Sequence, residues 1–312
     1  MQPYICKLTP ALKDYVWGGR QMAERYRFRT DLDRIAEAWV FSCHKDGASR
    51  VSSGPLAGKT LPEALDCWGP AALGSRAAAF PFFPILIKLI DAQGSLSVQV
   101  HPDDKYALRV EQEYGKTEMW LVLDAEPGAF LYYGFNRETN RAEVEQHIQN
   151  NTLTDLLAKV PVKAGDVFFI EAGTIHAIGA GLLIAEIQQN SNSTYRVYDF
   201  GRLGADGQPR PLHVDKALDV LQYGPARPPA QPDGLLADCP YFKAARHTVQ
   251  GETILPGRPD SFSALLCVEG TALLIAAGEE PLSLAPGDCL FIPADTPACS
   301  LTGSAQLIEA FV

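Results

Sequence analysis

The stretch Val162-Lys-Ala-Gly-Asp-Val-Phe-Phe-Ile-Glu-Ala-Gly-Thr-Ile-His176 recurs without gaps as Leu284-Ala-Pro-Gly-Asp-Cys-Leu-Phe-Ile-Pro-Ala-Asp-Thr-Pro-Ala298. Each copy contains a Gly-Asp turn, a short apolar run ending in Phe-Ile, and a second turn with a threonine. Short apolar runs between turn residues are typical of buried strands. The repeat therefore predicts two similar β units in one chain. The copies differ at one position of chemical interest, because His176 aligns with Ala298.

Around the repeat, 26 glycines and 23 prolines separate many other short apolar runs. This pattern predicts a mainly β protein built from barrels or sandwiches, with a few inserted helices. Strands are expected at 85–90, 95–101, 116–123, 128–133, 166–170, 183–189, 263–268, 272–275, 289–292 and 306–311. Helices are expected at 60–68, 103–113, 140–150, 152–159 and 214–222.

A proline-rich segment divides the chain. Four of the ten residues from Pro225 to Gly234 are proline, which is typical of a stiff, extended linker. We expect a first domain over 1–224 with helical insertions, a linker over 225–235, and a second barrel over 236–312. The last histidine in the chain is His247, so the second barrel cannot repeat a histidine site that includes His176. We therefore expect this barrel to hold no metal.

Composition excludes several classes of partner. With 27 basic and 37 acidic residues the net charge is −10, which disfavours binding to nucleic acid or an anionic membrane. The most apolar stretch, 77–87, is too short to span a bilayer, and the N-terminal residues do not resemble a secretory signal. Seven scattered cysteines without a Cys-x-x-Cys motif suggest reduced thiols. These features predict a cytoplasmic protein.

The segment 96–101, Leu-Ser-Val-Gln-Val-His, alternates apolar and polar residues. In a strand, Ser97, Gln99 and His101 would share one face. Glu118 on the next strand and His176 after the repeat strand could point to the same place. Two imidazoles, a carboxylate and an amide oxygen suit a divalent cation, zinc first. Taken alone, each histidine is equally consistent with an ordinary structural residue, and the other four histidines lie in no such pattern.

Basic residues form a second group of candidates. Lys88 interrupts an apolar strand, so it needs a bound anion or a carboxylate, for which Asp91 is the ordinary choice. Arg196 and Arg202 follow a polar run that suits a loop at a barrel mouth. Arginine is well suited to bidentate recognition of an anion such as phosphate. The alternative is that both arginines are solvated surface residues.

Six segments resemble the short bacterial form of the type I mannose-6-phosphate isomerase family, within the cupin superfamily. They are Val16-Trp-Gly-Gly19, Pro84-Ile-Leu-Ile-Lys88, Leu96-Ser-Val-Gln-Val-His-Pro-Asp103, Gly115-Lys-Thr-Glu-Met-Trp120, Ala172-Gly-Thr-Ile-His-Ala177 and Gln188-Gln-Asn-Ser-Asn-Ser-Thr-Tyr-Arg-Val-Tyr-Asp-Phe200. The resemblance implies two cupin (jelly-roll) barrels, of which the C-terminal one is degenerate. It implies one zinc per chain, held by Gln99, His101, Glu118 and His176. It also implies catalytic roles for Arg196, Lys116 and Glu186, and substrate contacts by Trp17, Lys88 and Ser97, to which we add Arg202.

The implied activity is a zinc-dependent aldose–ketose isomerisation in carbohydrate metabolism. Mannose 6-phosphate and fructose 6-phosphate would interconvert through a cis-enediol, so the partner is a small phosphosugar. The base stays open among Glu186, Lys116 and a water on the cation. Two other readings are a metal-dependent cupin dioxygenase and a non-catalytic cupin that binds sugar phosphates. Gln99, where other metal cupins carry a histidine, argues against the dioxygenase.

Overall fold

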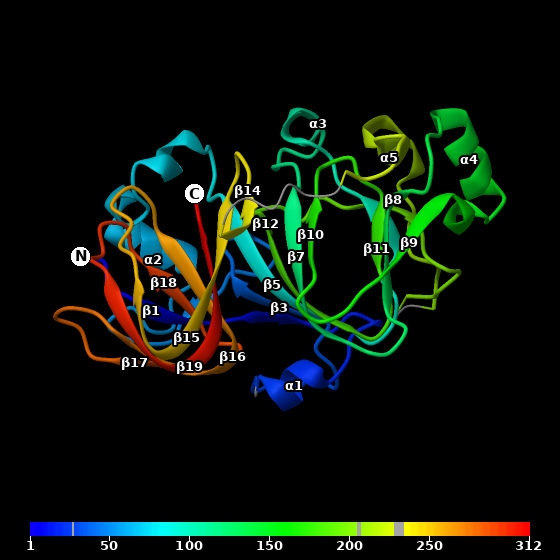
Figure 1. Ribbon diagram of the computed structural model, residues 1–312. Helices are drawn as coiled ribbons and strands as arrows, with labels where there is room; N and C mark the ends of the chain where they lie inside the picture. The colour runs from blue at the N-terminus through cyan, green and yellow to red at the C-terminus, as the bar shows by residue number, and fades with distance from the viewer. Residues whose placement is uncertain (27, 205–206, 228–233) are drawn as a thin grey trace.

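The computed structural model of the chain describes residues 1–26, 28–204, 207–227 and 234–312. The fold is mainly β, as predicted, and the strands form three antiparallel sheets connected by short helices and loops (Figure 1). Within these residues no helix has the length and hydropathy needed to span a bilayer.

The six-stranded sheet has the order β10-β7-β12-β5-β3-β2. Its strands are β2 (Ala11–Lys13), β3 (Glu37–Phe41), β5 (Ile85–Ala92), β7 (Glu118–Ala125), β10 (Val167–Ile170) and β12 (Leu182–Gln189). Strands β5 and β12 are buried along their whole length. Only Lys88, Asp91 and Glu186 place a charge inside these two apolar strands. Each of these side chains therefore needs a polar partner within the protein.

The five-stranded sheet has the order β13-β6-β11-β8-β9. Its strands are β6 (Val98–Val100), β8 (Phe130–Phe135), β9 (Leu157–Pro161), β11 (His176–Ile178) and β13 (Tyr195–Tyr198). Val98 and Val100 join an apolar cluster, whereas Gln99 lines a cavity on the other face. The predicted alternation is thus confirmed. Strand β11 pairs with β6 in a register that sets His176 opposite Gln99.

The eight-stranded sheet has the order β14-β15-β19-β16-β18-β1-β4, with β17 beside β16. Its strands are β1 (Cys6–Thr9), β4 (Arg50–Val51), β14 (Leu235–Asp238), β15 (Lys243–Leu255), β16 (Ser263–Ile275), β17 (Leu282–Leu284), β18 (Cys289–Ile292) and β19 (Cys299–Phe311). Residues 6–8 of β1 pair with residues 289–291 of β18. The regions on either side of the predicted linker therefore share hydrogen-bonded strands. Residues 228–233 of that linker lie outside the described residues.

A common aromatic core also joins the two regions. The Phe262 ring stacks with Phe41 at 6.0 Å between centroids, with Phe83 at 5.2 Å and with Phe291 at 6.0 Å. Phe41 and Phe83 come from the N-terminal region, and the other two from the C-terminal one. Each fully buried ring contributes about 1.5–3 kcal/mol by leaving water. The C-terminal strands thus complete the hydrophobic core of the chain.

Both copies of the sequence repeat adopt the same local structure. Gly165 and Gly287 have φ angles of +92° and +90°, in the left-handed region that favours glycine. The side chain of the aspartate after each glycine accepts a backbone N–H from three residues earlier, at 2.9 Å in both copies. Strands β10 and β18 follow at once. The repeat is therefore structural as well as sequential.

Most predicted helices are present. They are α2 (Leu61–Trp68), α3 (Asp104–Val110), α4 (Arg141–Gln149) and α5 (Val214–Val220), beside the short α1 (Gln21–Arg25), η1 (Pro70–Ala72) and η2 (Arg76–Ala79). The helix predicted over 152–159 is wrong: a single turn, η3 (Leu153–Leu156), leads into β9, which pairs with β8. The two strands predicted over 263–275 are one, β16, because a bulge between Cys267 and Glu269 absorbs the polar interruption. Strand β15 was not predicted, since its outer face is polar and exposed.

Candidate active site

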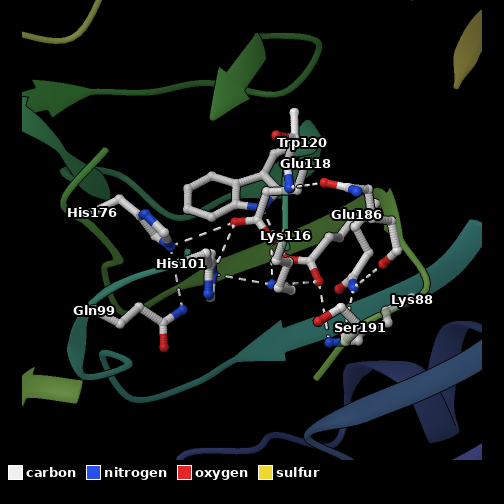
Figure 2. Close-up of polar contacts among 12 residues, drawn as sticks. Lys88, Gln99, His101, Lys116, Glu118, Trp120, His176, Glu186 and Ser191 are labelled. Carbon is white, nitrogen blue, oxygen red and sulfur yellow. Dashed lines mark hydrogen bonds and ion pairs between the residues drawn. The ribbon is translucent and has the colours of Figure 1, made fainter. Parts of the chain in front are cut away.

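Three buried side chains converge where the six- and five-stranded sheets meet (Figure 2). His101 follows β6, Glu118 begins β7 and His176 begins β11. Glu118 Oε1 lies 3.6 Å from His101 Nε2 and 3.5 Å from His176 Nε2. The three residues are at most 1% exposed. The structure thus assembles three of the four predicted ligands from separate strands.

The proton positions on the two imidazoles favour a cation at this point. His101 Nδ1 donates to the Ser193 carbonyl and His176 Nδ1 to the Thr174 carbonyl, both at 2.9 Å. Burial lowers the pKa of His101 to about 4 and also lowers the pKa of His176, so both rings are neutral. Their Nε2 atoms are then acceptors, and they face Glu118 Oε1, a buried oxygen that accepts no hydrogen bond from the described residues. Three converging lone pairs fit a metal ion.

Gln99 and Lys116 border this cluster. The amide nitrogen of Gln99 lies 3.4 Å from His176 Nε2, and a half-turn of the amide would present its oxygen instead. Lys116 Nζ contacts Glu118 Oε2 and lies 3.1 Å from His101 Nε2 and 3.6 Å from Glu186 Oε1. Burial disfavours charge on Glu118, but the ammonium of Lys116 outweighs it and holds the pKa of Glu118 well below its ordinary value.

A polar cavity of about 270 Å³ opens beside the cluster. The predicted residues that line it are Trp17, Lys88, Ser97, Gln99, Lys116, Glu186 and Arg196. His101, Glu118 and His176 do not line this cavity, but they contact Gln99 and Lys116, which do. A second cavity of about 560 Å³, lined largely by aromatic and apolar residues between α2 and β5, contains none of the predicted site residues. The chemistry therefore points to the smaller cavity.

Lys88 is paired inside this cavity with two glutamates. Its Nζ lies 3.2 Å from Glu186 Oε1 and 3.8 Å from Glu37 Oε2. Burial disfavours the ammonium, but Glu37 and Glu186 outweigh it, so the pKa of Lys88 lies above its ordinary value. The Trp39 indole donates to Glu37 Oε2, the oxygen that faces Lys88, at 2.6 Å, and the Trp120 indole donates to Glu186 Oε2, the oxygen farther from Lys88, at 2.9 Å. Lys88 therefore stays charged at the cavity wall.

Asp91 has a different role from the one considered in the sequence. Its Oδ2 accepts the backbone N–H of Gln21 at 2.7 Å, and burial raises its pKa to about 6. A Cβ at Gly19 would lie 2.5 Å from this carboxylate. The segment Trp17-Gly-Gly19 thus passes directly over Asp91, and this close approach explains why residue 19 is a glycine. The same contact fixes the segment that brings Trp17 to the cavity.

The arginines occupy unequal positions. Arg196 lines the cavity, donates from one terminal nitrogen to the Pro211 carbonyl at 2.9 Å, and has a buried Nε with no partner among the described residues. Arg202 bonds Asp199 and the Ser95 carbonyl and is absent from the cavity wall. Arg210 lines the cavity instead and forms a fork with Asp199, at 2.7 and 2.5 Å. Burial, and the positive charge of Arg210, lower the pKa of Arg196.

Sequence reasoning missed several cavity residues. Tyr15, Glu37, Asn192, Thr194 and Arg210 line the cavity but belong to none of the candidates predicted above. Asn192 and Thr194 lie in the polar run that precedes Arg196, so that run was the available signal. Tyr15 lies two residues before Trp17, next to a segment that was singled out, whereas Glu37 and Arg210 lie outside all of those segments and only the fold brings them to the cavity.

A second buried ionic cluster lies in the eight-stranded sheet, around Glu309. The Arg258 guanidinium donates to both Glu309 oxygens, at 2.6 and 2.8 Å. His247 Nε2 lies 2.9 Å from Glu309 Oε2, and the Ser263 hydroxyl donates to Oε1 at 2.6 Å. His247 therefore has a partner that its sequence neighbourhood did not reveal. Among described residues, only the His101 cluster has the grouping of donors that a metal ion needs.

The fold and the site define a cupin-type protein with a candidate metal centre. Residues 5–123 match the phosphomannose isomerase type I catalytic domain, and residues 234–312 match the mannose-6-phosphate isomerase cupin domain. The chain therefore belongs to the type I phosphomannose isomerase family, and it is an isomerase.

Relatives of nearly equal length support this assignment. The chain is 36% identical to the mannose-6-phosphate isomerase of Streptococcus mutans over 95% of its own length and 94% of the relative's. It is 34% identical to the mannose-6-phosphate isomerase ManA of Bacillus subtilis over 96% of each chain. The crystal structure of the mannose 6-phosphate isomerase from Bacillus subtilis superposes with a TM-score of 0.90 at 32% identity, covering 99% of this chain and 100% of the other.

Proposed function

We propose that this isomerase interconverts mannose 6-phosphate and fructose 6-phosphate through a cis-enediol and uses one zinc ion per chain. The observation that carries the proposal is the converging donor set of His101, Glu118 and His176 beside a cavity with basic walls. Membership of the family supports the choice of substrate. A dioxygenase is disfavoured because the cavity wall is built from lysines and arginines that suit a phosphorylated sugar.

Gln99, His101, Glu118 and His176 would hold the zinc ion. When bound, it would supply a positive charge that stabilises the enediolate oxygens, worth several kcal/mol of the barrier. These residues suit a zinc ion for three reasons. Both imidazole rings are neutral, Glu118 Oε1 accepts no hydrogen bond from the described residues, and the amide of Gln99 lies beside His176. Two backbone carbonyls keep the rings turned toward the same point, so little reorganisation is needed.

The proton transfer is assigned to the pair Lys116 and Glu186. Their Nζ and Oε1 atoms lie 3.6 Å apart at the cavity, next to Glu118. In the forward direction a proton leaves carbon 2 of the open-chain sugar and the C1 carbonyl oxygen takes up a proton, which gives the cis-enediol. The C2 hydroxyl then gives up its proton as C2 becomes the carbonyl, and carbon 1 receives the proton that left carbon 2. Either side chain can hold it in transit. Arg196, with its buried unpaired Nε, stabilises charge on the sugar oxygens.

Phosphate binding is assigned to Lys88 and Ser97, with Trp17 covering the sugar. All three line the cavity. Arg210, which also lines the cavity, would make the substrate contact that the sequence suggested for Arg202. The catalytic barrel is proposed to occupy most of residues 1–224. The barrel of residues 236–312 then serves structure, without a metal of its own and with β1 and β4 completing its sheet.

A coupled isomerase assay tests the function. We expect turnover of mannose 6-phosphate. Free mannose should react little or not at all because it lacks the phosphate that the basic side chains bind. Glucose 6-phosphate should react little or not at all because its configuration at carbon 2 differs. Oxygen uptake in the presence of iron should be absent. Purified, zinc-loaded protein that binds mannose 6-phosphate without isomerising it would contradict the proposal and favour a sugar-phosphate-binding role.

Two substitutions separate binding from chemistry. Lys88→Ala is expected to raise KM on the order of tenfold with a smaller change in kcat, since it removes a charge that contacts substrate before and during the reaction. Arg196→Ala is expected to lower kcat about 100-fold, as for other donors that face developing charge. Steady-state kinetics measure both. Arg141→Ala on α4, where Arg141 pairs with Asp219 at 2.8 Å, is the control with unchanged constants. Unchanged turnover without Arg196 would refute its role.

A further inference from the structure

The imidazole of His101 is oriented by a loop carbonyl. Its Nδ1 donates to the carbonyl of Ser193 at 2.9 Å, which leaves Nε2 free to face Glu118. Ser193 belongs to the polar run 191–194 between β12 and β13. This run has no regular secondary structure, so something other than a strand ladder must fix the position of its carbonyl. The partner of that loop is therefore of functional interest.

The carboxylate of Glu113 makes several contacts with this loop, beside single contacts from Gln188 to the Ser191 carbonyl and from Asn192 to Asp46. Glu113 Oε2 accepts the backbone N–H of Asn192 at 2.9 Å and lies 3.3 Å from the hydroxyls of both Ser191 and Ser193. The Ser191 hydroxyl also donates to the Tyr114 carbonyl at 2.8 Å. Because the Ser191 hydroxyl has one proton and its shorter bond is to Tyr114, Glu113 Oε2 accepts chiefly from the Asn192 N–H and the Ser193 hydroxyl.

The other oxygen of Glu113 is anchored on the opposite side. His44 Nε2 lies 2.9 Å from Oε1, and Lys45 Nζ lies 3.5 Å from it. His44 is itself buried, and its Nδ1 accepts the backbone N–H of Asp46 at 3.1 Å, so its Nε2 carries the donated proton. Burial disfavours charge on Glu113, but His44 and the Asn192 N–H outweigh it and lower its pKa to about 2. The carboxylate is therefore ionised and fixed at both ends.

We propose that Glu113 is a positioning residue of the metal centre, acting through the loop 191–193 and the Ser193 carbonyl on the imidazole of His101. This inference rests on the proposed metal site, and it goes beyond that site because Glu113 contacts none of its four ligands. Asn192 and Thr194 of the same run line the cavity, so Glu113 also sets one part of its wall. Partners behind a metal ligand commonly contribute 10- to 100-fold to metal affinity.

The test compares zinc affinity in two matched variants. Glu113→Gln keeps the shape of the side chain but replaces one acceptor oxygen by an NH2 donor. This donor must face either the N–H and hydroxyl donors of the loop or the proton on His44 Nε2. By competition with a chromophoric chelator, we expect zinc to bind about 10- to 100-fold more weakly. The control is Glu111→Gln on the same turn, because Glu111 bonds Tyr195 at 2.8 Å and Lys216 at 2.7 Å and does not contact the loop. Its zinc affinity should stay within fivefold of the original protein.

A second readout follows the His101 ring in the metal-free protein. Long-range proton–nitrogen NMR should report the Nδ1–H tautomer in the original chain and its loss or mixing in Glu113→Gln. Loss of affinity below fivefold, or an equal loss in both variants, would overturn the inference. If Glu113→Gln does not fold, Glu113→Asp, with a shorter side chain, is judged by the same limit. If the original chain binds no zinc, the metal proposal fails, and the tautomer alone decides the role of Glu113.

Discussion

Replacing Glu118 by Gln is expected to leave the protein folded but without its metal, and to lower turnover by at least about 1,000-fold. Glu118 is the only anion among the four proposed ligands, and its Oε1 faces both imidazoles at 3.5–3.6 Å. The amide of Gln carries no charge, and it also removes the nearest anion from the Lys116 ammonium, which then keeps only Glu186, at 3.6 Å, among the described residues. Metal analysis should find one zinc per chain in the original protein and less than a tenth of that in the variant.

Chelation provides the complementary experiment on the unmodified chain. Removal of the metal should abolish isomerisation, and addition of zinc, cobalt or manganese should restore it. Glu126→Gln, an exposed carboxylate just beyond the end of β7, serves as the control and should keep both metal and activity. Full activity in demonstrably metal-free protein would refute the metal-dependent mechanism.

The second large effect concerns stability. Arg258→Met is expected to lower the free energy of unfolding by about 3–5 kcal/mol, because it leaves the fully buried carboxylate of Glu309 without its two-point partner. His247 and Ser263 still contact that carboxylate, but neither replaces the two hydrogen bonds of the guanidinium. Urea denaturation measures the change. Zinc content should not change, since Arg258 lies in the loop between β15 and β16 of the eight-stranded sheet, whereas His101 follows β6 of the five-stranded sheet.

The same pair gives this stability a defined pH dependence. Burial opposes the charge on Glu309, but Arg258, His247 and Ser263 outweigh it and lower its pKa from 4.5 to about 2. A depressed carboxyl pKa stabilises the fold above the unfolded value near 4.5, and this contribution is lost as pH falls toward 2. The shift corresponds to about 3 kcal/mol. The difference between the original chain and Arg258→Met should therefore be full above pH 5 and shrink below it. If the free energies of unfolding of the original chain and of Arg258→Met differ by less than about 1 kcal/mol at pH 7, the pair of Arg258 and Glu309 is not stabilising.

Local sequence patterns predicted the parts of the site that depend on one strand or one turn. The alternation through 96–101 placed Gln99 and His101 on the correct face, because a strand has a strict period of two. The repeat predicted that His176 follows a strand and that a Gly-Asp turn precedes this strand. Glu37 and Glu113 escaped prediction because each acts through a partner far away in sequence, and Arg210 because no motif marks its segment. Their roles exist only once the sheets and the loop 191–193 are in place.

The same limit applied to the fold. Buried strands such as β5 were visible as apolar runs, whereas the long, half-exposed β15 had no such signal. No pattern in residues 6–9 revealed that β1 pairs with β18, since backbone hydrogen bonds carry no side-chain signature. For Lys88, the sequence correctly required a carboxylate nearby, but the nearest candidate in the chain, Asp91, was the wrong one.

The pairing of β1 with β18 also constrains how the protein is made. Residues 6–8 are synthesised long before their partners at 289–291. Until then β1 presents an unpaired edge, and the aromatic core around Phe262 lacks half of its rings. Contacts of such high sequence separation form slowly. This pairing therefore forms only after residue 291 has been synthesised, and until then β1 has β4 as its one partner strand.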